Sequence, residues 1–170
     1  VGIEVPNKVA ALVRLGSLIL YPEFNEAGPL NFALGRNVSG DPVFADISKM
    51  PHMLVAGATG SGKSITIHSI ILSLLYKNSP DMLKLILIDP KRVELSIYNG
   101  IPHLLAPVIT ENKKAIGALR WAIQEMERRY QILMEAGSRD IKSFNGKNKE
   151  EPLPYLVIII DELADLMTSY

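Results

Sequence analysis

The stretch Gly57-Ala58-Thr59-Gly60-Ser61-Gly62-Lys63-Ser64 decides the fold of this chain. It matches the pattern G-x-x-x-x-G-K-[ST] at every fixed position, with an apolar run at residues 53–56 before it and a helical pattern after it. Glycines let such a loop wrap with its backbone N–H groups pointing inward, and the N-terminus of the following helix adds partial positive charge. The sequence therefore predicts a loop that binds the phosphates of a nucleotide.

The alternative interpretation of this loop is a turn rich in glycine and serine with an incidental lysine. Four fixed positions coincide by chance in well under ~1% of chains of this length, so we favour binding of ATP or a close relative. In such loops the lysine reaches the β- and γ-phosphates and the Ser or Thr hydroxyl binds Mg²⁺, roles that fall to Lys63 and Ser64. We expect nucleotide contacts from Gly57, Ala58, Thr59, Gly60, Ser61, Gly62, Lys63, Ser64 and Ile65.

An acidic pair, Asp161-Glu162, follows the apolar run at residues 156–160, as in a Walker B strand with a catalytic glutamate. The carboxyl end of a buried parallel strand faces the ligand crevice of its sheet. There Asp161 would support Mg²⁺ and Glu162 would polarise the attacking water. Alternatively, the pair caps a helix that starts near Leu163. Because a phosphate loop lies in the same chain, we favour the metal and water roles, with Glu162 and Lys63 as the catalytic residues.

Hydrophobic periodicity predicts an α/β fold with strands at residues 53–56, 83–88 and 155–160 and helices at 63–76 and 113–136. Strands that alternate with helices favour a mostly parallel sheet covered on both faces. We expect one short helix within residues 6–19, a hairpin with strands at 30–36 and 42–46, and a mobile loop at 138–154. The long helix should be amphipathic, with its cap at Gly137 and an apolar stripe: Ile116, Leu119, Ile123, Met126, Tyr130, Leu133 and Met134.

Composition sets limits on these hypotheses. The 170 residues include 18 Lys and Arg, 18 Asp and Glu, and no Cys, so a disulfide framework is excluded and net charge gives no support for nucleic-acid binding. No run is apolar for the roughly 20 residues that a membrane span requires, which predicts a soluble chain. The first residue is not Met, which indicates a piece of a longer protein.

Smaller features leave alternatives open. The turn Asp89-Pro90-Lys91 follows a predicted strand, and it could sense phosphate, contact a neighbouring subunit or form a solvated turn. The basic clusters Arg128-Arg129 and Lys147-Asn148-Lys149 are more often solvated surface than DNA contacts.

Beyond the motifs, seven segments resemble the motor domain of the FtsK/SpoIIIE family of DNA translocases, and the likeness extends from Ile3 to Met167. They are GDPVFAD (40–46), MPHMLVAG (50–57), IDPK (88–91), ELS (94–96), GIPHLL (100–105), LRWA (119–122) and EMERRY (125–130). The resemblance implies a RecA-like P-loop ATPase in which Thr59, Gly60 and Gly62 cradle phosphate, Lys63 and Ser64 bind phosphate and Mg²⁺, Asp161 supports the ion and Glu162 is the general base.

The same resemblance implies a hexameric ring that uses ATP to pump double-stranded DNA in chromosome segregation at cell division or sporulation. Full-length members carry N-terminal membrane spans, so a parent protein on the cytoplasmic face of the bacterial inner membrane is expected. Two alternatives remain: a related ring ATPase that energises protein secretion or conjugative transfer, and a non-catalytic scaffold gated by nucleotide.

The resemblance also predicts the domain organisation. Residues 1–48 would form a helix and hairpin element, and residues 49–170 a RecA-like core that lacks its C-terminal part. In the resembling fold, a strand from that part lies between the phosphate-loop strand and the Walker B strand. We therefore expect a gap in the sheet, and a chain of residues 1–170 that is deficient in hydrolysis and ring assembly.

Overall fold

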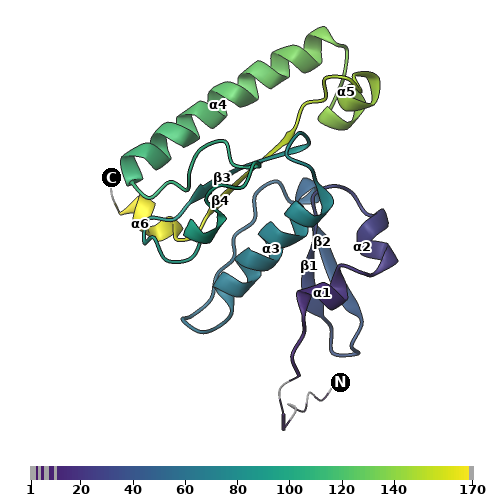
Figure 1. Cartoon of the computed structure of the whole chain (residues 1–170), viewed down its shortest axis with the longest axis vertical. Coiled ribbons are helices and arrows are strands. Elements are labelled where there is room, and N and C mark those ends of the chain that lie inside the picture. Colours follow the sequence, from purple (N-terminus) through teal and green to yellow (C-terminus); the bar gives the residue numbers. More distant parts are fainter. Residues whose placement is uncertain (1–2, 4, 6–7, 10, 169–170) are drawn as a thin grey trace. The chain divides into compact units, whose positions relative to one another are not determined.

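The computed structural model describes residues 3, 5, 8–9 and 11–168 (Figure 1). Its contacts divide the chain into two compact units, Val1–Lys77 and Asn78–Tyr170, and each is described by itself below. The predicted organisation into a helix and hairpin element at residues 1–48 and a partial core at residues 49–170 stays a prediction. No helix within the described part of the chain is both long and apolar enough to cross a bilayer.

The first unit opens with two short helices and an antiparallel hairpin. In the hairpin, Phe32 pairs with Ala45, and the turn is closed by Asn37, whose side-chain oxygen accepts the N–H groups of Ser39 and Asp41 at 3.0 and 2.9 Å. The predicted hairpin is confirmed. The elements are α1 (Leu15–Leu18), α2 (Pro22–Glu26), β1 (Asn31–Arg36), β2 (Pro42–Asp46) and the 3₁₀ turn η1 (Ile47–Lys49).

The one short helix predicted within residues 6–19 is present as α1 (Leu15–Leu18). Residues 11–14 are not helical, only α1 forms, and residues 6, 7 and 10 lie outside the described part. A helix of four residues has few backbone hydrogen bonds, so it needs side-chain packing in order to extend. Leu12, just before it, is 77% exposed and provides no such packing.

Helix α3 (Lys63–Lys77) confirms the helix predicted after the phosphate loop, and it packs on β1 (Figure 1). The buried Ser73 hydroxyl accepts the Ala33 N–H at 3.2 Å, and the Ser69 hydroxyl donates to the Ala33 carbonyl at 2.8 Å. At the helix end, the Lys77 ammonium donates to the carbonyls of Phe24 and Ala27. Burial lowers the pKa of Lys77. These contacts fix the helix that begins at the phosphate loop.

The strand predicted at residues 53–56 is wrong, because the structure assigns it no ladder partner. Leu54 is 78% exposed, and the sheets of the described residues contain only the pairs β1–β2 and β3–β4. A strand is stabilised by the neighbour with which it shares backbone hydrogen bonds, so an apolar run alone does not form one.

The second unit is built on two parallel strands, β3 (Leu83–Ile88) and β4 (Tyr155–Ile160), and both match the predicted bounds. The register pairs Leu83 with Tyr155 and Ile88 with Ile160. Bridges from Leu85 to Leu104 and from Ile88 to Ile109 extend β3 on its other edge, beyond the 3₁₀ turn η2 (Ser96–Tyr98). β3 is almost wholly buried, as a central parallel strand should be.

Helix α4 (Asn112–Glu135) confirms the predicted long helix, and Gly137 follows it with a φ of 56°. Its N-terminal part packs on the sheet, where the buried Ala115 meets Ile86, Ile88 and Leu166 of α6 (Leu163–Met167). The described residues leave most of the predicted apolar stripe uncovered. Ala115 is its only buried residue, and four stripe members are exposed: Ile123, Met126, Tyr130 and Met134.

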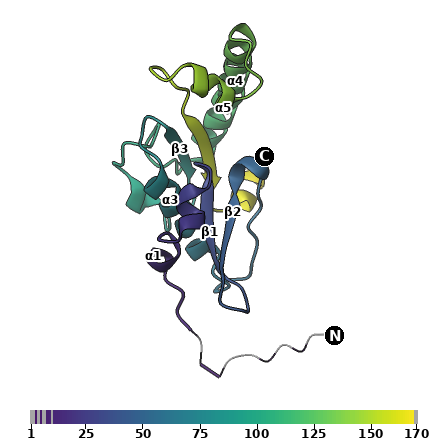
Figure 2. The same cartoon turned by 90° about the vertical axis from the view of Figure 1, so that its right-hand side faces the viewer.

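The loop predicted at residues 138–154 contains a helix, α5 (Ile141–Lys147), that the periodicity did not indicate. A capping box starts it: the Asp140 carboxylate accepts the Ser143 N–H at 2.7 Å, and the Ser143 hydroxyl bonds the Asp140 N–H at 3.3 Å. Figures 1 and 2 show α5 beside the C-terminal end of α4 and before the start of β4.

Candidate nucleotide site

The phosphate loop in the first unit has the backbone geometry that anion binding requires. Gly60 and Gly62 have φ values of 81° and 98°, which side-chain-bearing residues adopt only with strain. The Ser61 N–H bonds the Ala58 carbonyl at 3.0 Å, and α3 begins at Lys63. The helix N-terminus therefore opens directly onto the loop, where its N–H groups and partial positive charge favour an anion.

Gly57 is required by a close approach inside the same loop. A Cβ built there would lie 2.2 Å from the Ser61 Oγ and 3.2 Å from its Cβ. The first turn of α3 is secured by Thr66, whose N–H and hydroxyl both bond the Gly62 carbonyl, at 2.9 and 3.0 Å. The loop thus fits a polyphosphate: it is wrapped, open to ligand and glycine-lined where side chains would intrude.

The residues predicted to contact the nucleotide differ in their exposure to solvent. Lys63 and Ser64 are half-buried, whereas Gly57, Ala58, Thr59, Gly60 and Ser61 are exposed. Ile65 is 73% exposed on the first turn of α3. Its predicted role as a nucleotide contact stays a prediction.

The acidic pair lies in the second unit, at the carboxyl end of β4. Asp161 is 8% exposed, and its N–H bonds the Ile88 carbonyl at 3.0 Å, which continues the parallel ladder by one residue. Asp89 follows β3 at the neighbouring register position and is fully buried. The two parallel strands therefore each end in a buried aspartate at one edge of the sheet.

Glu162 occupies the N-cap position of α6 but makes no side-chain capping hydrogen bond. This disfavours the alternative in which the pair only caps a helix. The Glu162 carboxylate instead lies 3.5 Å from the ammonium of Lys91, which also lies 3.7 Å from the Asp165 carboxylate. The Walker B pattern predicts neither contact of Lys91. The position of Lys91 just after β3 did indicate that it would lie at the carboxyl ends of the two parallel strands.

Asp89 shapes the turn that carries Lys91. Its Oδ2 accepts the N–H groups of Glu94 and Leu95 at 3.0 and 2.9 Å, while its buried Oδ1 receives no hydrogen bond from the described residues. Sequence patterns give no sign of this anchoring, because it depends on how the chain turns back after β3.

The phosphate loop belongs to the first unit and the acidic pair to the second, so the assignment of both to one nucleotide remains a prediction. What the structure brings together is the set Lys91, Asp161, Glu162 and Asp165 at the β3–β4 edge. No group of three His, Asp or Glu side chains suited to a metal ion occurs among the residues that the structure describes.

A glycine-lined loop that opens onto a helix, together with a parallel strand that ends in Asp-Glu, defines an α/β protein of the P-loop ATPase class. Solved structures of that class resemble this chain. The conjugation coupling protein TcpA of pCW3, solved as a monomer with ATPγS, is 31% identical, has a TM-score of 0.67, and is matched over 87% of this chain and 40% of its own. The cytoplasmic domain of the Type VII secretion ATPase EccC of Thermomonospora curvata is 26% identical, with a TM-score of 0.74 over 94% of this chain and 22% of its own.

The chain belongs to the FtsK/SpoIIIE family, whose model matches residues 21–169. A DNA translocase FtsK of Caldanaerobacter subterraneus subsp. tengcongensis is 58% identical over 98% of this chain and 24% of its own length. The DNA translocase SftA of Bacillus subtilis is 55% identical over 98% of this chain and 18% of its own. The chain thus spans about a quarter or less of these relatives. The resemblance seen in the sequence is confirmed at the level of family and fold.

Proposed function

We propose that this chain is part of an ATP-driven motor that translocates double-stranded DNA. The observation that supports this most strongly is identity above 50% over nearly the whole chain with proteins named DNA translocases. The structure contributes a phosphate loop of suitable geometry, in which Gly60 and Gly62 adopt positive φ. The hexameric ring, the part in chromosome segregation and the place at the inner membrane are further parts of this proposal.

The roles that we propose for the site residues follow from the chemistry of their side chains and of the loop backbone. The loop backbone and Lys63 would bind the phosphates of ATP and hold the γ-phosphate in line for attack. The Ser64 hydroxyl and the Asp161 carboxylate would hold Mg²⁺, since hydroxyl and carboxylate oxygens suit this hard cation. When bound, the ion neutralises charge on the phosphate oxygens. Glu162 would orient the attacking water and accept its proton.

A ring ATPase for secretion or conjugative transfer is the second candidate, because the structural neighbours include a conjugation coupling protein and a secretion ATPase. Their identities of 31% and 26% are well below those of the DNA translocases, which favours the first candidate. The fold alone does not separate the two, since one architecture serves several substrates.

The test uses the complete protein and measures ATP hydrolysis with and without linear duplex DNA. We expect duplex DNA to stimulate turnover, and Glu162→Gln to lower kcat at least about 100-fold, since a positioned acid–base group contributes 10²–10⁴-fold. ATP affinity should be retained in this variant, whereas Lys63→Ala should weaken it. Glu150→Gln, in the exposed segment after α5, is the matched control.

Two outcomes would contradict the proposal in different ways. Turnover that ignores duplex DNA but responds to a protein substrate would favour the second candidate. A complete protein that binds ATP but does not hydrolyse it, with or without duplex DNA, would support the non-catalytic scaffold instead.

A further inference from the structure

The turn after β3 presents one lysine to the proposed catalytic glutamate. Asp89, fully buried, accepts two backbone N–H groups from Glu94 and Leu95, and its own carbonyl accepts the Arg92 N–H at 3.1 Å. Arg92 has a φ of 59°, the left-handed region that is uncommon for a residue with a side chain. A strained backbone conformation persists only where surrounding contacts hold it in place, and such conformations cluster at functional sites.

The ammonium of Lys91 lies between two carboxylates, 3.5 Å from the Glu162 Oε2 and 3.7 Å from the Asp165 Oδ2. The three side chains come from the turn after β3, the N-cap of α6 and the first turn of α6. The Lys91 side chain is 54% exposed, and exposed ion pairs contribute little to stability. The two ion pairs of Lys91 therefore contribute little to folding energy and do not by themselves explain why Lys91 is held at this place.

We propose that Lys91 is a positioning residue that holds the Glu162 carboxylate in place for ATP hydrolysis. The inference rests on the proposed function, because it gives Lys91 a partner whose role is to orient water. The Lys91 ammonium lies within ion-pair distance of the Glu162 carboxylate, so it can restrict the orientations that this carboxylate adopts. A misplacement of about 1 Å in a catalytic group can cost up to 10²-fold in rate.

The kinetic test compares variants of the complete protein. Lys91→Met removes the charge and keeps the length of the side chain, and we expect it to lower kcat for ATP about tenfold with KM changed less than about twofold. Lys91→Arg restores a cation and should recover most of the lost kcat. Lys149→Met removes an exposed lysine from the segment after α5 and should change neither constant.

Two alternative roles of Lys91, a phosphate contact and a solvated turn, give kinetic results that differ from those of a positioning residue. A raised KM with unchanged kcat would overturn the proposal and indicate a phosphate contact. A Lys91→Met variant that behaves as Lys149→Met would overturn it in favour of a solvated turn. If Glu162→Gln itself keeps normal turnover, the proposed function fails along with the inference. If only Glu162→Gln is impaired, the inference alone fails.

A second measurement does not depend on activity or on a variant that folds. A zero-length carbodiimide reagent joins amines to carboxylates that form ion pairs, and mass spectrometry identifies the residues joined. In the nucleotide-free complete protein we expect a cross-link from Lys91 to Glu162, with one to Asp165 as a second product. Cross-linking of Lys91 to neither carboxylate, while Lys114 is joined to Glu111 across their 2.7 Å pair, would overturn the proposal.

Discussion

Gly57 and Ser61 approach each other closely inside the phosphate loop, so a methyl group at position 57 should disturb it. The added Cβ would meet the Ser61 hydroxyl at 2.2 Å and the Ser61 Cβ at 3.2 Å. The hydroxyl can rotate away, but the Cβ must shift with the backbone. We expect Gly57→Ala to weaken ATP binding about tenfold, because overpacking costs roughly 1–3 kcal/mol. Titration with a fluorescent ATP analogue measures this.

The matched controls for this prediction lie in the same chain. A Cβ added at Gly117 of α4 would meet no atom within 4 Å, so Gly117→Ala should leave ATP affinity unchanged and slightly stabilise the helix. Combining Gly57→Ala with Ser61→Ala removes the Ser61 hydroxyl but keeps the Ser61 Cβ, so it should recover only the part of the affinity that the hydroxyl contact costs. If the double variant binds no better than Gly57→Ala alone, the hydroxyl is not the cause, and the 3.2 Å contact with the Ser61 Cβ accounts for the loss.

Motif residues of the candidate site could be named from sequence, because each is set by a local pattern: fixed glycines before a helix, or two acids after a strand. Lys91 and Asp165 could not be assigned, since their pairing with Glu162 depends on a turn after β3 and on the helix that starts at Leu163. Asp89 shows the same limit, because its two backbone partners lie five and six residues ahead in a loop.

At the scale of elements, a carboxylate on α4 connects that helix with the segment that enters β4. Glu125 binds Arg128 at 2.7 and 2.8 Å and Arg129 at 2.7 Å, and Arg129 in turn donates to the Pro154 carbonyl at 2.6 Å. The hydrogen bond from Arg128, followed by that from Arg129, lowers the pKa of Glu125 from 4.5 to about 2. The Glu125 side chain is only 11% exposed, so solvent screens this network weakly.

This shift predicts a pH dependence of stability. Because the folded-state pKa of Glu125 lies below its unfolded value of 4.5, the stabilisation is present above about pH 4.5 and is lost as pH falls towards 2. Glu125→Gln should remove at most roughly 3 kcal/mol from the free energy of unfolding at pH 7 and flatten its decline in acid. Urea unfolding at several pH values, followed by the fluorescence of Trp121 on α4, measures this.

Glu127→Gln, on the same helix but exposed, is the control and should keep the acid decline of the unaltered chain. Identical pH profiles for the two variants would contradict the role given to Glu125.

Elements with strong local signals were predictable to the residue, and those that need a distant partner were not. β3 and β4 are apolar runs bounded by polar or proline residues, and both bounds were correct. The run at residues 53–56 looks equally strand-like, yet it has no ladder neighbour in the described sheets. α5 was missed because its start depends on Asp140 and Ser143 rather than on an apolar period.

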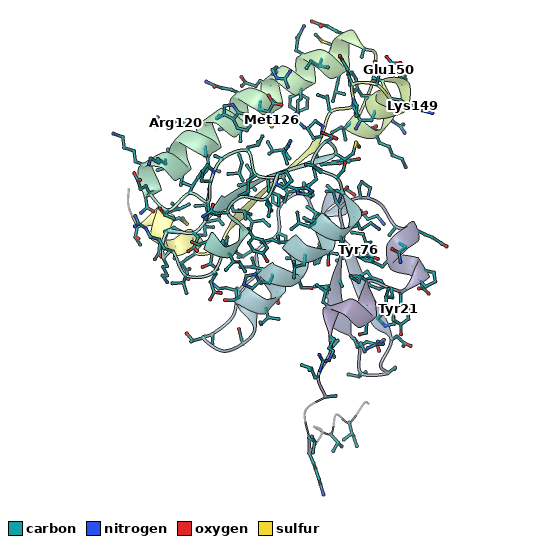
Figure 3. The ribbon with its side chains drawn as sticks, in the orientation of Figure 1. Tyr21, Tyr76, Arg120, Met126, Lys149 and Glu150 are labelled. Carbon is teal, nitrogen blue, oxygen red and sulfur yellow. The ribbon has the colours of Figure 1, made fainter. Side chains whose placement is uncertain are left out.

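For the whole molecule, charge balance restricts how this chain can contribute to DNA binding. With 18 basic and 18 acidic residues, no general attraction to phosphate arises from its composition. The best-formed basic cluster is already engaged, since Arg128 and Arg129 both bind Glu125. Near the end of α5, the Lys147 ammonium donates to the Gly137 carbonyl at 3.3 Å. Lys149, labelled in Figure 3, lies in the exposed segment that follows.

We therefore expect Lys147, the last residue of α5, and Lys149, which follows the helix, to make no contribution to duplex binding. In the complete protein, the double variant Lys147→Gln, Lys149→Gln should bind duplex DNA as tightly as the unaltered protein. The slope of log affinity against log salt should also stay unchanged, because each phosphate contact adds about 0.9 to its magnitude. Fluorescence anisotropy titrations at several salt concentrations measure both quantities. A slope reduced by about 2, with weaker binding to every sequence, would instead identify these two lysines as phosphate contacts.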